Sequence, residues 1–155
     1  MSSAFLCGFI SKDDMTDYNE TIFVQILCDF IKRNHIDTIY TCERNYFDRA
    51  CRISTMMGSV RHKIKFVRLY DGIKNLYLEE DGLCDEYLSP FDSIIEPGFY
   101  YTKMYTYAME HSTSMITYYK YDNDICATIA TSALHKGIKV FNLRKELKKR
   151  NALWF

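Results

Sequence analysis

Short apolar segments and segments with helical periodicity alternate along most of the chain. The first apolar run, Phe5–Ile10, has no charged side chain and is typical of a strand buried on both faces. Between Thr21 and Asn34 the apolar residues recur at the spacing of one helix face. Repeated alternation of strand and helix requires a mostly parallel sheet covered by helices. The sequence therefore predicts an α/β fold: a Rossmann-like, doubly wound, mostly parallel five-stranded sheet with helices on both faces.

The boundaries of the predicted elements follow from the same patterns. The predicted strands are Phe5–Ile10, Ile36–Tyr40, Ile64–Tyr70, Ser114–Tyr119 and Ile138–Asn142. The predicted helices are Thr21–Asn34, Phe47–Met57, Tyr100–Glu110, Asp124–His135 and Arg144–Arg150. Asp17 or Asn19 could cap the first helix, and Gly58 and Gly137 are expected just after the second and fourth. The segment Asp71–Pro97 is predicted to hold one short helix and a long loop, either a lid over a site or a surface excursion.

The composition agrees with a single globular domain over residues 1–155. Twenty basic and 20 acidic side chains cancel, so no overall field draws the chain toward nucleic acid or an anionic membrane. No window approaches the roughly 20 apolar residues of a membrane span. The six cysteines lack C-x-x-C spacing, so we expect free buried thiols in a reducing cytoplasm, with no metal and no cofactor. The sequence is compatible with a monomer or a homo-oligomer.

Two polar turns follow predicted strands at the edge where ligands bind. In doubly wound sheets the ligand lies beyond the carboxyl ends of the strands, near the switch in strand order. The turn 41–48 has no glycine, but Arg44 could bind a phosphate or carboxylate beside Asn45 and Asp48. Alternatively, Asp48 caps the next helix and Arg44 is solvated. The turn 119–126 carries tyrosines and carboxylates that could bind a ribose or a base, or could cap a helix.

These turns and the ends of the first and third predicted strands supply the candidate ligand-binding residues. They are Cys7, Gly8, Phe9, Cys42, Arg44, Asn45, Asp48, Tyr70, Tyr119, Asp122 and Asp124. Among them, Cys42 could be a reactive thiol at a helix N-terminus or a structural thiol. The run Arg144–Arg150 is typical of a solvated basic helix rather than of a binding site.

Several short motifs at the ends of the predicted elements resemble one known family. The motifs are Leu6-Cys7-Gly8-Phe9, the turn from Cys42 to Asp48, Leu69-Tyr70, the stretch from Met109 to Thr113, Asp124-Ile125-Cys126, and the closing Ala133-Leu134-His135-Lys136-Gly137-Ile138-Lys139-Val140-Phe141-Asn142-Leu143. Their order resembles the SLOG superfamily, the Rossmann-like group of DprA, the LOG phosphoribohydrolases and the YpsA-like proteins. The YpsA-like branch is the most similar, and its closing pattern Ala-x-x-x-Gly-Ile-x-Val-x-Asn-Leu is the most specific match.

The resemblance implies a nucleotide or nucleotide-derived ligand in this cleft. However, both glycine-rich phosphate loops have lost their glycines, and the Pro-Gly-Gly-x-Gly-Thr-x-x-Glu motif of the phosphoribohydrolases is absent. Three functions therefore remain open. The first is a sensor or sequestering domain for a small ligand. The second is a hydrolase of an N-glycosidic bond that uses Glu43, Asp48 or Glu110. The third is a protein-interaction module with a vestigial cleft.

Overall fold

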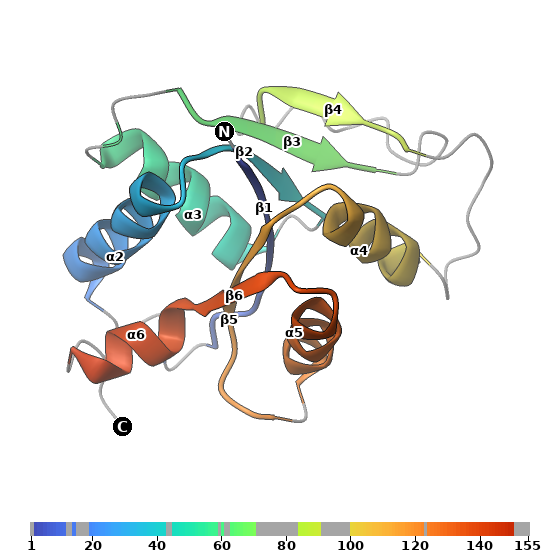
Figure 1. Cartoon of the computed structure of the whole chain (residues 1–155). Coiled ribbons are helices and arrows are strands. Elements are labelled where there is room, and N and C mark those ends of the chain that lie inside the picture. The colour runs from blue at the N-terminus through green and yellow to red at the C-terminus, as the bar shows by residue number, and fades with distance from the viewer. Residues whose placement is uncertain are drawn as a thin grey trace.

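Six parallel strands form a single sheet in the order β4-β3-β2-β1-β5-β6 (Figure 1). The computed structural model describes residues 2–11, 14, 19–42, 45–58, 60, 63–70, 84–90, 100–122 and 124–150. The strands are β1 (Ser2–Gly8), β2 (Ile36–Thr41), β3 (Lys65–Leu69), β4 (Glu86–Leu88), β5 (Ser114–Tyr118) and β6 (Lys139–Asn142). The predicted α/β, Rossmann-like, doubly wound architecture is confirmed, with six strands rather than five.

Helices cover both faces of this sheet. They are α2 (Glu20–Arg33), α3 (Tyr46–Met57), α4 (Tyr100–Glu110), α5 (Ile125–His135) and α6 (Leu143–Lys149). Helices α2, α3 and α6 lie on one face, while α4 and α5 lie on the other (Figure 1). All five begin and end within one residue of the predicted bounds. For α2 and α3 this agreement reflects an apolar face long enough to give a clear period.

The central strand β1 contributes to the core on each face. Ala4 and Leu6 pack with α2, α3 and α6, in what we call the α2/α3 core. Phe5 and Cys7 point the other way and pack with α4 and α5, in the α4/α5 core. Pairing with β2 begins at Ser2, so the strand starts before the predicted Phe5 and ends at Gly8 instead of Ile10. Successive side chains of a strand alternate between faces, which is why a continuous apolar run suits this position.

Strand β4 lies where the sequence predicts a short helix and a loop. Asp85 fixes it to β3, because its carboxylate accepts the Phe66 N–H at 2.8 Å and its own N–H donates to the Phe66 carbonyl at 2.9 Å. The same carboxylate pairs with Arg52 of α3 at 3.2 Å. A strand of three residues is too short to show a period, so only its partner β3 reveals it. Residues 71–83 and 91–97 of the predicted loop lie outside the described residues.

Gly137 and Gly58 each end a helix, but for different reasons. Gly137 has a φ of +78°, and its N–H donates to the Leu134 carbonyl while that of Ile138 donates to Ala133, which is a Schellman ending. Gly58 also ends its helix, as predicted, but its backbone is extended rather than left-handed. A Cβ at Gly58 would lie 2.1 Å from Cys28 Sγ, and close packing of α2 explains the glycine.

Helix α6 is docked by a buried ion pair rather than fully solvated as its basic sequence predicts. Arg144 Nε donates to Asp14 Oδ2 at 2.9 Å, and both side chains are buried. The same oxygen accepts the Tyr118 hydroxyl at 2.9 Å, which joins the end of β5 to the pair. Of the helices in the described part of the chain, none combines the length and apolar character needed to cross a membrane.

Candidate functional site

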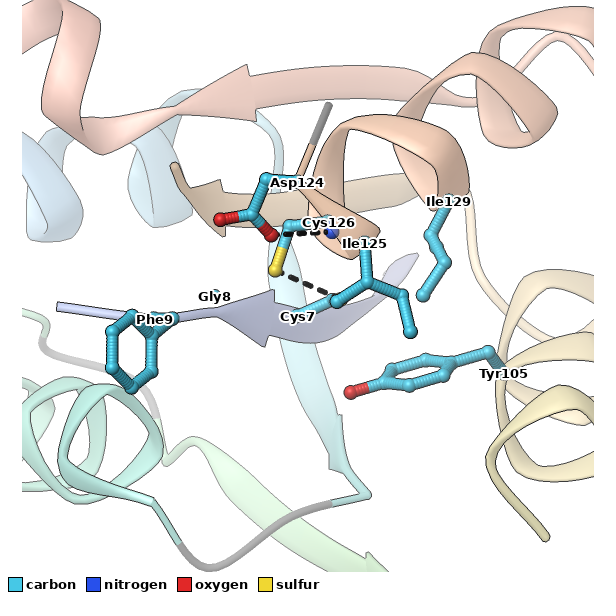
Figure 2. A pocket seen from close by; sticks show the side chains of 8 residues that line it. All are labelled: Cys7, Gly8, Phe9, Tyr105, Asp124, Ile125, Cys126 and Ile129. Atoms are coloured by element: carbon cyan, nitrogen blue, oxygen red, sulfur yellow. Dashed lines mark hydrogen bonds between the residues drawn. The ribbon is translucent and has the colours of Figure 1, made fainter. Parts of the chain in front are cut away.

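A pocket of about 330 Å³ opens at the carboxyl end of β1 (Figure 2). Strand β1 has β2 on one side and β5 on the other, so the chain winds outward from it in both directions. This is the switch point at which doubly wound sheets bind their ligands. The lining residues are Cys7, Gly8, Phe9, Tyr105, Asp124, Ile125, Cys126 and Ile129. Four of them, Cys7, Gly8, Phe9 and Asp124, belong to the predicted set.

Three elements build the walls of this pocket. The end of β1 supplies the floor, and its continuation is held by the Phe9 N–H, which donates to the Tyr118 carbonyl at 2.9 Å. The start of α5 supplies the second wall, where Asp124 Oδ1 accepts the Cys126 N–H at 2.9 Å as the N-cap. Tyr105 reaches in from α4, with its ring 6.2 Å from that of Phe5. Figure 2 shows its hydroxyl directed toward the end of β1.

The mouth of the pocket is apolar. Phe9 is 61% exposed and Ile125 is 66% exposed, although both are large hydrophobic side chains. A second hollow of about 320 Å³ runs on between α4 and α5 and shares Tyr105, Ile125 and Ile129 with the first. Exposed apolar side chains that gather around a concave surface are typical of a binding site.

On the α2/α3 side of β1, the carboxyl edge of the sheet is filled by side chains of the protein itself. A Cβ on Gly8 would lie 2.7 Å from the Phe47 ring, so the absent side chain makes room for Phe47. Asn45 Nδ2 donates to the Gly8 carbonyl at 2.8 Å, and Asn45 Oδ1 accepts the Asp48 N–H at 3.0 Å. Asn45 is therefore the N-cap of α3, the role that the sequence offered to Asp48. This half of the edge is closed within the described residues.

A buried polar corner lies next to this closed half. The Thr41 hydroxyl donates to Asp48 Oδ2, and both residues are buried. Burial, together with the charge of Asp48, holds the pKa of the Cys51 thiol well above its usual range. Arg68 is the register partner of Thr41 on β3 and is only 6% exposed. Among the described residues, no acceptor pairs with its Nε or Nη1.

Two other candidate ligand-binding residues lie in the core or in the sheet instead of lining the pocket. Cys42 is buried in the α4/α5 core, which fits the structural reading of its thiol rather than the reactive one. Tyr70 continues β3, where its N–H donates to the Leu88 carbonyl at 3.1 Å. Arg44, on which the predicted anion contact depends, lies outside the described residues, as does Glu43.

The remaining candidates do not meet at one place. Tyr119 lines a different hollow, between α5, β6 and α6, and its carbonyl accepts Asn142 Nδ2 at 3.4 Å. Asp122 is exposed in the turn before α5. Glu110 ends α4 just ahead of β5 and therefore lies at the amino-terminal edge of the sheet, opposite the pocket. The carboxylates proposed for hydrolysis thus share no site among the described residues.

Sequence reasoning missed several residues of the site. Tyr105 and Ile129 lie inside helices, and helical periodicity does not tell which partner a face will meet. Arg68 sits in an apolar strand, where a charged residue is unusual and could have been singled out. Among the described residues, no cluster of three or more potential metal ligands was found.

Comparison with known proteins identifies no family for this chain. No protein-family model and no curated protein matches the chain. The resemblance to the SLOG superfamily therefore stays a prediction.

Proposed function

We propose that this chain is a small-ligand-binding domain, a sensor or sequestering module, that recognises the base and sugar of a nucleotide-derived molecule. The supporting observation is the open pocket at the switch point of the sheet, lined by the end of β1 and the start of α5. Open α/β sheets bind ligands in this crevice whatever their chemistry. The similarity of the strand-end motifs to SLOG proteins supports the nucleotide class.

The lining chemistry suits a planar base joined to a hydroxylated ring. Phe9 and Ile125 offer exposed apolar surface against which a base can stack or pack. Asp124 uses Oδ1 for its own helix cap, and the described residues bring no donor to Oδ2. A carboxylate oxygen in the lining of a pocket can accept hydrogen bonds from the hydroxyls of a ribose.

The same lining disfavours a phosphate in this pocket. A helix N-terminus attracts anions through its unpaired N–H groups and its dipole. At α5, however, the Asp124 carboxylate already holds the Cys126 N–H and places a negative charge where the phosphate would bind. At α3, Asn45 caps the helix and Phe47 fills the space beside Gly8. The loss of the glycine loops is thus accompanied by closure of both anion positions, and we expect a nucleoside to bind about as tightly as its phosphates.

The proposal is tested first by thermal stabilisation against matched nucleosides, nucleotides and inorganic phosphate. A ligand at 100 times its Kd stabilises the native state by about 2.7 kcal/mol. For a domain of this size, that raises Tm by roughly 5–10 °C. We expect shifts with a nucleoside and its nucleotide, and none with phosphate alone. The absence of any shift across the panel would favour the protein-interaction function.

The second test changes the charge of Asp124 while keeping its cap. Asn caps helices as well as Asp does, so Asp124→Asn should leave Tm nearly unchanged. A neutral acceptor binds hydroxyls less strongly than a carboxylate, so nucleoside affinity should fall roughly five- to tenfold by calorimetry. Asp122→Asn, in the same turn but outside the pocket lining, is the matched control and should bind normally. Tighter nucleotide binding by Asp124→Asn would show that the phosphate sits at α5 after all.

A further inference from the structure

Two cysteine thiols touch each other in the wall of the pocket. The Cys7 thiol points to Cys126 Sγ at 3.6 Å, across 119 residues of sequence, and Figure 2 marks the contact. Neither cysteine forms a disulfide, and only 2% of Cys7 and 3% of Cys126 is exposed. We propose that this pair is a two-electron oxidation site, which a hydroperoxide converts into an intramolecular disulfide.

The two sulfur atoms are already in van der Waals contact. An S–S bond is about 2.05 Å long, so the two sulfurs need to approach by roughly 1.5 Å. Each cysteine side chain can rotate about its χ1 bond, and small rotations of both would bring the two sulfurs closer by this distance. The backbones of β1 and α5 already pack against each other at this point, so no element has to move far.

Access to the pair comes from the pocket itself. Cys7 and Cys126 are the cysteines that line the cavity of about 330 Å³, which is large enough for hydrogen peroxide. By contrast, Cys28 and Cys51 are buried under α2 and α3 on the other face, where the Cys28 thiol donates to the Ser54 carbonyl at 3.6 Å. Burial also raises the pKa of Cys51 and so suppresses its thiolate.

The chemistry balances with peroxide as the named oxidant. One thiol, as its thiolate, attacks a peroxide oxygen, the O–O bond breaks, and a sulfenic acid and hydroxide form. The second sulfur then attacks the sulfenic sulfur and displaces its oxygen, which leaves as water. In total, two thiols and one hydrogen peroxide give one disulfide and two waters. The pair contributes two electrons, and the adjacent partner protects the sulfenic acid from further oxidation.

The bond would join the two walls of the pocket. It would tie the end of β1 to the first turn of α5 and draw them together where Asp124 caps the helix. We therefore expect the oxidised protein to bind the pocket ligand less well. This last consequence rests on the proposed function, whereas formation of the disulfide does not.

The experiment counts and maps thiols after oxidation. The Cys84→Ser protein, which lacks the one cysteine that is not buried, is treated with hydrogen peroxide, quenched with catalase, unfolded and alkylated with N-ethylmaleimide. We expect two fewer alkylated thiols than in the untreated sample, a mass lower by two hydrogens before alkylation, and a tryptic cross-link between Cys7 and Cys126. Dithiothreitol should restore both thiols. An unchanged count, a cross-link between other cysteines or one between two molecules would overturn the proposal.

Matched variants separate this site from general oxidation. Cys7→Ala should abolish the cross-link, while Cys28→Ala, an equally buried thiol on the other face, should leave it intact. Mapping of the otherwise unaltered chain gives the same answer without any cysteine substitution if one of these variants fails to fold. Thermal shifts of the oxidised and reduced protein with a nucleoside then test the effect on binding. If no nucleoside shifts either form, the proposed function fails and the disulfide result still stands.

Discussion

Gly8 lies between the open and the closed half of the carboxyl edge of the sheet. A side chain there would collide with the Phe47 ring at 2.7 Å, and Phe47 is fully buried. We therefore expect Gly8→Ala to lower the free energy of unfolding by about 1–3 kcal/mol, the usual result of overpacking a core. Urea unfolding followed by circular dichroism measures it.

Phe47→Leu provides the control for this residue. In a background with the smaller side chain, Gly8→Ala should cost clearly less, because the two residues touch and their effects are coupled. An equal cost in both backgrounds would mean that the glycine is required for another reason, such as backbone conformation at the end of β1.

At the level of elements, the Asp14–Arg144 pair helps to hold α6 to the sheet, together with the buried Leu143 and Leu147. Asp14→Asn would remove the carboxylate charge that faces the buried guanidinium of Arg144 and accepts the Tyr118 hydroxyl. Breaking a buried ion pair from one side typically costs about 3–5 kcal/mol. We expect a loss of that size in urea unfolding, with local loss of amide protection in α6.

The double substitution Asp14→Leu with Arg144→Met tests whether charge or shape matters. Replacing both partners with apolar side chains of similar size is often neutral or stabilising. The double variant should therefore be more stable than Asp14→Asn alone. If it is as unstable as the single variant, the specific hydrogen bonds to Asp14 are required and the electrostatic explanation is wrong.

At the level of the whole molecule, two cores share one sheet. The α2/α3 core contains Leu27, the α4/α5 core contains Met104, and β1 contributes to each. We expect a single cooperative transition, in which Leu27→Ala and Met104→Ala each lower the stability of the entire chain by about 2–5 kcal/mol. Far-ultraviolet circular dichroism and tyrosine fluorescence should give the same urea midpoint for each variant. Separate midpoints would show that the two faces unfold independently.

The helices and the strands other than β4 were predictable because their signals are local. The apolar run of β1 and the helical period of α2 depend only on neighbouring residues. The caps Asn19 and Asp124 were likewise among the predicted candidates, since a short polar side chain ahead of an apolar period is a local signal. Once strands and helices alternate, the carboxyl edge of the sheet follows as the place to look for a site.

What the tertiary structure alone decided is which side chains meet at that edge. Strand β4 exists through its pairing with β3, Tyr105 reaches the pocket because α4 packs beside α5, and the Cys7–Cys126 contact joins residues 119 positions apart. Phe47 closes one half of the edge for the same reason. Such contacts depend on how faces of elements pack across long stretches of sequence, which periodicity and capping do not encode. The sequence by itself determined the alternation of elements and hence the sheet, whereas packing determined which half of its edge is open.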